Sequence, residues 1–328
     1  MKKNLIVGLL ISALLVYFSL KDIDMGSVAE AFKSVRYGYA FLTLFCLFLI
    51  QALRSYRWGL LLAPFDKIGQ FDLFAVTSVG FLAVVAIPAR LGELARPYLI
   101  AGKSNVSMAV ALGTVFVERI FDILTVLAAF FLLLPFIPLP PWLTKAGMLF
   151  LLVALAALVF LLFVVFKREE AGRLLIPVFR RFPEGLNRGL EALLHHFVDG
   201  LAVLSNVRTT FYVAGLSVLI WVIDAAAVYL LFLSFGFDLP LAAAFVVMVV
   251  LIIGIAIPTA PGFIGNWHFF CILGLSLFGV PKTEALSYAV VFHALGVGVI
   301  VFLGLAFLPF NRFSLSDIRR RVDINVNL

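Results

Sequence analysis

Three groups of polar side chains stand in an otherwise apolar sequence, and the first is rich in arginine. It reads PARLGELARP from Pro88 onward. Arginine is a permanently charged planar fork that suits phosphate, and Pro88 and Gly92 permit a break where backbone N–H groups are free to bind an anion. The pattern predicts a lipid-phosphate site on Arg90 and Arg96. A loop in which Glu93 merely pairs with Arg96 explains it equally well.

The second group is Glu118, Arg119 and Asp122, inside a long apolar run. Glu118 and Asp122 share one helix face, and Arg119 lies within reach of Asp122. A charge at mid-membrane costs about 2.5 kcal/mol or more and is usually functional. We predict that Arg119 binds phosphate, while the surplus acid holds a second arginine, such as Arg90, or takes up a proton. The alternative is a structural ion pair that locks two helices.

The third group surrounds a helix break. Its breaking residues are Pro258, Pro261, Gly262 and Gly265. Beyond the break, Asn266 and His268 are predicted to face a polar cavity, where a histidine titrates near neutral pH. A hinge beside an interfacial tryptophan is the alternative.

Other polar residues lie singly. Asp224 and His293 stand alone in apolar runs, and helix–helix contact explains them at least as well as chemistry does. Arg54 and Arg57, beside a tyrosine and a tryptophan, are typical of an anchor at the membrane surface. The residues predicted to support the site or exchange a proton are Glu93, Glu118, Asp122, Asp224 and His268.

Composition indicates where these groups must be held. Of 328 residues, 64% are hydrophobic and 13% are charged, against about 45–50% and about 25% in soluble domains. A soluble enzyme, a disordered chain, a disulfide scaffold and a nucleic-acid-binding domain are therefore excluded. No catalytic, cofactor or metal motif is present, so we expect no cofactor and no metal. Cys46 and Cys271 are predicted to be small buried hydrophobic residues without a disulfide.

The apolar runs predict an all-α polytopic membrane protein, with residues 1–328 forming a single integral membrane domain. Residues 5–20 are predicted to be an uncleaved first helix. The remaining runs fall at about 37–53, 73–88, 107–134, 146–166, 211–235, 241–257, 262–279 and 285–309. Residues 184–206 have the apolar period of one helix face, which predicts an interfacial helix on the inner leaflet or a link between two halves.

The net charge of +7 indicates orientation. With the N-terminus inside, the cytoplasmic loops hold 19 Lys or Arg and 10 Asp or Glu, and the external loops hold 5 of each. The excess of basic residues in the cytoplasmic loops predicts that both termini lie in the cytoplasm. The protein itself is predicted to lie in the inner (cell) membrane.

Comparison of the sequence with itself at an offset of 170 residues predicts an internal repeat. Ala86-Ile87-Pro88 lands on Ala256-Ile257-Pro258, Gly92 on Gly262, and Arg54 on Asp224. The halves, about 1–145 and 146–310, would be inverted in the membrane. The broken segments 73–88 and 241–279 then become opposed re-entrant hairpins beside six full crossings. Eight full spans are the alternative.

At this level of detail the sequence resembles the lysylphosphatidylglycerol synthase transmembrane-region family of flippase-like membrane proteins. Three blocks carry the resemblance: Pro88-x-Arg90-x-Gly92-Glu93-x-x-Arg96, Glu118-Arg119-x-x-Asp122, and Pro261-Gly262-x-x-Gly265. The resemblance covers roughly residues 5–310. It implies an α-helical domain with re-entrant segments that works on anionic lipids. Many members carry Glu where His268 stands, which leaves a carboxylate role at this position in doubt.

These observations favour a flippase-like protein that moves an anionic lipid, either a phospholipid or a polyprenyl-phosphate-linked lipid, between leaflets. The alternative is a membrane transferase, or a subunit with a soluble or membrane-bound transferase partner, acting on phosphatidylglycerol or lipid-linked sugars. Larger family members carry a soluble transferase domain. This chain stops at Leu328 without one, so we expect no lysyl transfer by this chain alone. An assembly factor and a homo-oligomer both stay open.

Overall fold

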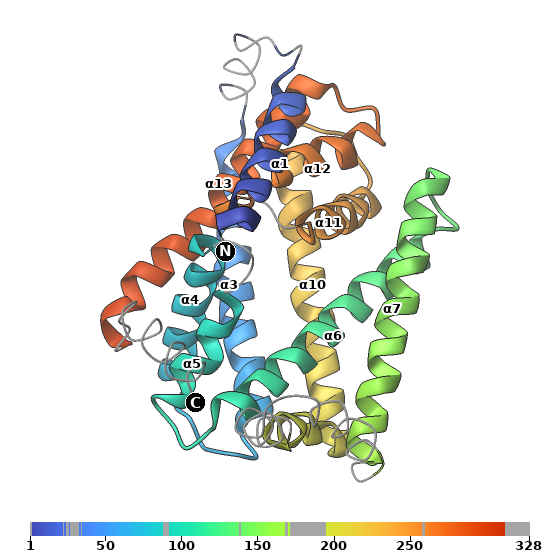
Figure 1. Cartoon of the computed structure of the whole chain (residues 1–328). Helices are drawn as coiled ribbons and strands as arrows, with labels where there is room; N and C mark the ends of the chain where they lie inside the picture. Colours follow the sequence, from blue (N-terminus) through green and yellow to red (C-terminus); the bar gives the residue numbers. More distant parts are fainter. Residues whose placement is uncertain are drawn as a thin grey trace.

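The fold is a bundle of helices, seen in a computed structural model of the whole chain (Figure 1). The structure describes residues 2–21, 23, 26, 33, 35–87, 92–137, 139–167, 170, 195–257 and 260–311. Within these ranges every regular element is a helix. The all-α prediction is therefore confirmed, and the molecule is an integral, multi-pass membrane protein.

Among the described residues, four helices are long and apolar enough to cross a membrane. They are α3 (Tyr37–Leu62), α7 (Pro141–Phe166), α10 (Val207–Phe235) and α13 (Lys282–Phe307), the last continued by η4 (Leu308–Phe310). A helix of 26 residues, such as α3 or α7, is about 39 Å long at 1.5 Å per residue, which exceeds the ~30 Å hydrocarbon core.

Helix α6 (Met108–Leu133) is as long as α3 and α7, with 26 residues, but it carries three charged side chains in its middle. Ser107 begins the helix by accepting a hydrogen bond from the Val110 N–H at 3.2 Å, a standard N-cap. Because these charges lie inside an apolar bundle, they need partners from neighbouring helices.

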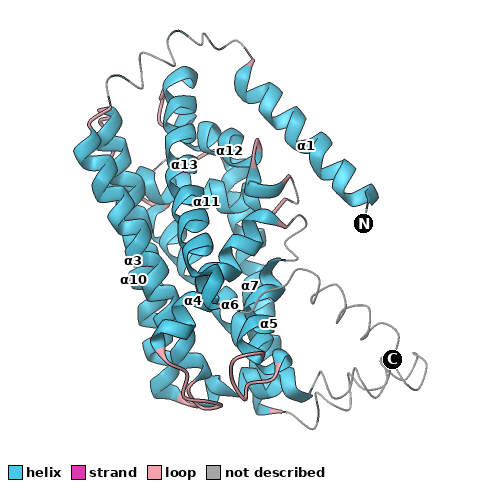
Figure 2. Ribbon diagram, turned by 90° about the vertical axis from the view of Figure 1, so that its left-hand side faces the viewer, coloured by secondary structure: helices cyan, strands magenta, loops and turns pink. Residues whose placement is uncertain are grey.

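Helix α1 (Lys2–Leu20) lies to one side of the bundle (Figure 2).

Two pairs of short helices lie at opposite ends of the bundle in both views (Figures 1 and 2). The first is α4 (Gln70–Ala86) with α5 (Ala95–Ala101), and the second is α11 (Leu241–Ile255) with α12 (Asn266–Ser276). Helices α4 and α11 have 17 and 15 residues, or about 25 and 22 Å. Each is shorter than the ~30 Å core and is followed by a chain reversal.

Helices α3 and α10 pack against each other antiparallel, and they lie at the left-hand side of the molecule in Figure 2. The start of α3 meets the end of α10, because the Arg36 N–H donates to the Ser234 carbonyl at 2.8 Å. Further along, the Thr43 hydroxyl donates to the Ala227 carbonyl at 3.2 Å. Helix α10 ends at Gly236, whose φ of 71° is the left-handed conformation that glycine adopts without strain. Helices α4, α6, α11 and α13 pack against this pair.

The structure corrects one boundary that matters for the site. The apolar run predicted at about 37–53 ends before Arg54 and Arg57 and so left both in the loop that follows, but α3 continues to Leu62. Arg57 and Trp58 are therefore fully buried, at 1% and 0% exposure. Their interpretation as part of a membrane-surface anchor was wrong for these two residues, because the helix carries them inward.

Part of the predicted helix at 184–206 is described. Residues 195–201 are helical and η2 (Ala202–Ser205) follows. Val198 and Leu201 pack against α6 and α7, and Gly200 lies against the backbone of Gly113 on α6. This part is thus attached to the bundle, while residues 184–194 lie outside the described residues.

Candidate functional site

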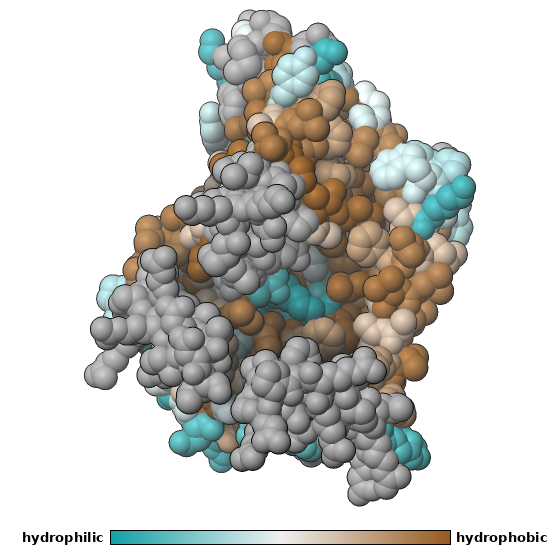
Figure 3. Space-filling model, in the orientation of Figure 1, coloured by the Kyte–Doolittle hydropathy of each residue, from teal (hydrophilic) through white to brown (hydrophobic). Residues whose placement is uncertain are grey.

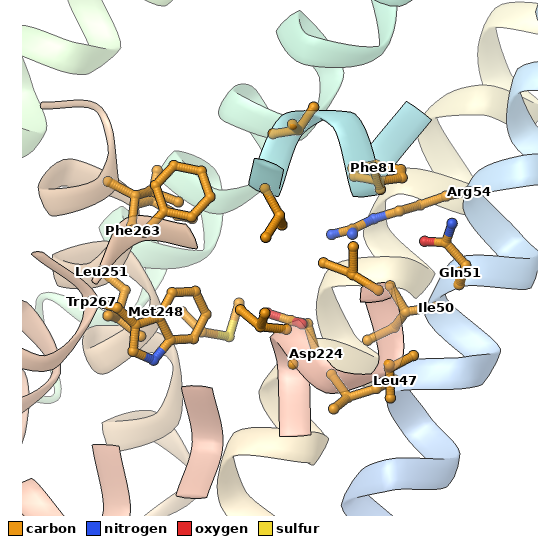
Figure 4. Close-up of a pocket in the computed structure, with 18 of the residues that line it drawn as sticks. Leu47, Ile50, Gln51, Arg54, Phe81, Asp224, Met248, Leu251, Phe263 and Trp267 are labelled. Carbon is orange, nitrogen blue, oxygen red and sulfur yellow. The ribbon is translucent and has the colours of Figure 1, made fainter. Parts of the chain in front are cut away.

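A cavity of about 260 Å³ lies near the middle of the molecule, where α3, α4, α6, α10, α11 and α13 meet. Its walls are mostly apolar. The charged residues that line it are Arg54, Glu93, Arg96, Arg119 and Asp224. Figure 3 shows hydrophilic atoms at the floor of a hollow whose sides are hydrophobic. In Figure 4, Arg54 and Asp224 reach into the cavity from opposite sides. A charged pocket inside a membrane domain marks a functional site by default.

Behind the cavity wall, Arg57 joins three helices in a buried ion-pair network. Its Nη1 lies 2.6 Å from Asp122 Oδ1, its Nη2 lies 3.1 Å from Asp122 Oδ2, and its Nε lies 3.4 Å from Glu118 Oε1. Nη1 also donates to the Ser217 hydroxyl on α10 at 2.7 Å. The Trp221 indole N–H donates to Asp122 Oδ1 at 3.1 Å. Asp122 and Glu118 are thus held in place by α3 and α10.

Arg96 extends from α5 to the same network. Its Nη1 donates to Glu118 Oε2 at 2.8 Å, and its guanidinium lies 4.2 Å over the Trp58 ring. A side chain at Gly80 would have its Cβ only 2.1 Å from Arg96 Cγ, so the glycine leaves the space that this arginine occupies. Arg96 Nε and Nη2 are buried and make no hydrogen bond to the described residues. An unpaired buried donor is costly, and a bound anion would satisfy it.

Arg119 and Arg54 complete the basic side of the cavity. Arg119 Nη1 lies 3.8 Å from Asp122 Oδ2, a weak contact, and its Nε has no hydrogen-bond partner in the described part of the chain. The Arg54 guanidinium lies 5.3 Å over the Phe81 ring. Both arginines therefore hold donor capacity that the described residues do not use.

The two chain reversals are built differently. After α11, the Asn266 amide donates to the carbonyls of Gly254 at 2.7 Å and Ile257 at 3.3 Å, which closes the end of that helix. Gly262 and Gly265 have φ values of 70° and 85°, where a side chain would be strained. Pro261 begins the short η3 turn (Pro261–Phe263). Pro261, Gly262 and Gly265 thus lie in the segment that separates α11 from α12.

In the first reversal, Gly92 is held by close packing. A Cβ there would lie 2.2 Å from the carbonyl carbon of Ala83 on α4, so only glycine allows this approach. Glu93, the next residue, reaches the cavity wall. Pro88, Arg90 and Pro258 lie outside the described residues.

His268 lies apart from the cavity. Its ring centre is 4.8 Å from that of His293, and His293 Nε2 lies 2.7 Å from the Gly262 carbonyl. The cavity wall here is formed by Trp267 and Phe292 instead. Neither Asn266 nor His268, which were predicted to face a polar cavity, lines this one. His293 contacts the second reversal at the Gly262 carbonyl. No group of three or more metal-ligating side chains occurs among the described residues.

Sequence reasoning missed Arg57 and Gln51. The surplus acid beside Arg119 was expected to hold a second arginine such as Arg90, and in the structure it holds Arg57 and Arg96. A signal was available, because Gln51, Arg54 and Arg57 recur every three residues and so lie near one helix face. Gln51 lines the cavity, and its amide Nε2 is buried without a described partner.

The sequence matches a known protein family over most of its length. The family model described as "Lysylphosphatidylglycerol synthase TM region" matches residues 5–304. The chain belongs to this family. Every residue that lines the cavity falls within the matched range, so the site lies in the lysylphosphatidylglycerol synthase TM region itself.

Relatives within this range are described only as membrane proteins. A UPF0104 membrane protein of Methanothermobacter thermautotrophicus is 27% identical over 312 residues, covering 90% of this chain and 92% of the relative. A UPF0104 membrane protein of Methanocaldococcus jannaschii is 26% identical over 218 residues, covering 66% and 89%. No solved structure matches the chain.

Proposed function

We propose that this protein binds the phosphate of an anionic lipid in the central cavity and moves the lipid between the two leaflets. The lipid is either a phospholipid or a polyprenyl-phosphate-linked lipid. One observation carries the proposal: Arg96 and Arg119 present buried N–H groups without a hydrogen-bond partner among the described residues, at the wall of a cavity inside a membrane protein.

Arginine suits this ligand better than lysine would. Its planar fork donates two parallel hydrogen bonds to phosphate, and it stays charged at every physiological pH. The buried carboxylate of Glu118 holds the guanidinium of Arg96 from one side. The carboxylate of Asp122 approaches the guanidinium of Arg119. The remaining donors of both arginines are left for a phosphate. Arg90, which lies outside the described residues, is the third arginine of this proposal.

The size of the cavity limits what enters it. About 260 Å³ lies just below the ~300–1,000 Å³ of most small-molecule pockets. A head group fits such a space, but the acyl or prenyl chains do not. In the proposed mode the head group crosses the protein while the apolar chains remain in the lipid.

The proposed topology has six full crossings, two opposed re-entrant hairpins and both termini in the cytoplasm. Its support is the pairing of helix starts, since α3, α4 and α5 begin at Tyr37, Gln70 and Ala95. Their proposed repeat partners α10, α11 and α12 begin at Val207, Leu241 and Asn266, which is 170 or 171 residues later. Opposed hairpins of this kind bring a substrate site to the bilayer midplane.

Purified protein in liposomes tests the proposal. A fluorescent phosphatidylglycerol should exchange between leaflets, measured as the fraction accessible to an external quencher. Arg119→Ala should slow this exchange roughly tenfold or more, since a charged hydrogen bond is worth about 1.5–3 kcal/mol. Arg208→Ala removes an arginine that lies over Tyr212 outside the cavity and should exchange at the wild-type rate. Equal rates for Arg119→Ala and wild type would remove Arg119 from the site.

A further inference from the structure

The cavity holds a carboxylate that the arginines do not occupy. Asp224 lines the cavity from α10 and is only partly buried. No hydrogen bond or ion pair joins it to the described residues, although the charges of Arg54 and Asp122 act on it at longer range. Glu118 and Asp122, in contrast, each form an ion pair with Arg57.

An anion that enters this cavity must lie close to Asp224. A sphere of about 260 Å³ is about 8 Å across, so a phosphate on the arginine side lies within roughly that distance of the carboxylate. Two like unit charges at ~8 Å, in surroundings of effective dielectric constant ~20, weaken binding by roughly 30-fold. A proton on Asp224 removes this repulsion.

The other charged or titratable groups around Asp224 either are not carboxylates or already have partners of their own. The charged or titratable side chains that face it from the packed helices are Cys46 and Arg54 on α3, Arg119 and Asp122 on α6, and Tyr288 on α13. Helix α11 contributes only apolar residues to the cavity wall. Glu93 and Arg96 line the same cavity from the first hairpin, and both have partners of their own.

We propose that Asp224 is a proton-binding site coupled to the anion site, so that the protein takes up a proton from water when a lipid phosphate enters the cavity. This inference rests on the proposed lipid-phosphate function. The proton is held on a carboxylate oxygen of Asp224 and returns to water when the anion leaves. Anion and proton then cross together as a neutral pair, and a pH gradient across the membrane drives the lipid toward the more alkaline side.

Linkage between the two sites makes the effect measurable. Binding is reciprocal, so a proton that favours the anion is itself favoured by the anion. The affinity for the anion should therefore be highest at low pH and fall as pH rises. The total fall should be about 30-fold, and the slope at its steepest should stay below tenfold per pH unit.

The experiment is a titration of the full chain in a non-ionic detergent with short-chain phosphatidylglycerol, between about pH 5 and pH 9. A phosphodiester is used because it has no second phosphate proton, which in monoesters titrates near pH 6. Repeating the calorimetry in buffers of different ionisation enthalpy counts the protons taken up. We expect up to one proton per bound anion for the wild type, and an affinity that decreases with pH.

Two variants isolate Asp224. Asp224→Asn should bind with the low-pH affinity of the wild type at every pH and take up no proton. Asp224→Glu restores a titratable carboxylate and should restore the pH dependence. Asp72→Asn is the matched control, because Asp72 is exposed and pairs with Lys103 outside the cavity, and it should behave as the wild type.

The outcomes separate the two proposals. No binding of phosphatidylglycerol by the wild type at any pH would contradict the lipid-phosphate function. Binding that is independent of pH, or that keeps its pH dependence in Asp224→Asn, would overturn the role of Asp224 and leave the anion site standing. If Asp224→Asn does not give a monodisperse protein, the test is the number of protons taken up per bound anion, compared between the wild type and Asp224→Glu.

Discussion

Removing Arg57 should destabilise the protein more than removing any exposed cation. Arg57→Ala takes away hydrogen bonds to Asp122 at 2.6 and 3.1 Å and a contact with Glu118 at 3.4 Å. Loss of one partner from a buried ion pair costs about 3–5 kcal/mol, because a charge is left uncompensated. Here Glu118 keeps Arg96, and Asp122 keeps the Trp221 N–H. We therefore expect the lower figure, about 3 kcal/mol.

A thiol-reactive fluorophore converts this loss into a melting curve. Cys271 is fully buried and reacts only when the bundle opens. The half-buried Cys46 is replaced by alanine in every protein compared. Unfolding entropy of about 2.1 cal/mol/K per residue implies that 3 kcal/mol lowers Tm by about 4 °C for a chain of this length.

The matched control is an exposed ion pair with the same atom separation. Lys103 Nζ lies 2.6 Å from Asp72 Oδ1, but both side chains are accessible. Lys103→Ala should cost about 0.2–1 kcal/mol, which shifts Tm by about 1.5 °C or less. The combined change Arg57→Met and Asp122→Leu should recover part of the stability lost by Arg57→Ala, because an apolar side chain replaces the uncompensated Asp122 while Glu118 keeps its pair with Arg96. An equal Tm for Arg57→Ala and Lys103→Ala would refute the reasoning.

Three further predictions concern the two hairpins and the approach to the cavity. Asn266→Ala removes the amide bonds to the Gly254 and Ile257 carbonyls and should cost about 1–3 kcal/mol in the same thermal assay; an unchanged Tm would mean that these bonds do not close the helix. Gly80→Ala places a Cβ 2.1 Å from Arg96 Cγ and should weaken phosphatidylglycerol binding, whereas Gly215→Ala, with open space around it, should not; equal binding by both would contradict the packing argument. Single cysteines at Glu93 and Phe263, in a chain without Cys46 and Cys271, should react with a membrane-impermeant maleimide from opposite faces of the membrane; labelling of both from one face only would refute the opposed hairpins.

Much of the fold follows from the sequence because long apolar runs have few alternatives in a bilayer. The breaks at Gly92 and Gly262 were visible as sequence, and in the structure each marks a reversal between two short helices. The 170-residue offset was also visible, and it recurs in the starts of α3 and α10. These features are local in the chain or repeat at a fixed spacing, so pattern reasoning reaches them.

The partners within the site were harder to predict. Arg57 and Asp122 are 65 residues apart, and their contact depends on α3 continuing past the end of its apolar run. Hydropathy ends a helix where charges begin, so it placed Arg57 in a loop. The exclusion of His268 from the cavity depends on the rotation of α12 by a single residue, since its neighbour Trp267 lines the wall. Neither the packing partner nor this rotation is written in a local pattern.

The central claim is that the arginines of the cavity hold the phosphate of an anionic lipid. Native mass spectrometry of the protein, purified from cells in a mild detergent, tests it most directly by identifying the lipids that remain bound. We predict an anionic, phosphate-bearing lipid on the wild type and its loss from the double variant Arg96→Gln and Arg119→Gln, with Arg208→Gln retaining it. The same bound anionic lipid on all three proteins, or only zwitterionic lipid on the wild type, would contradict the account.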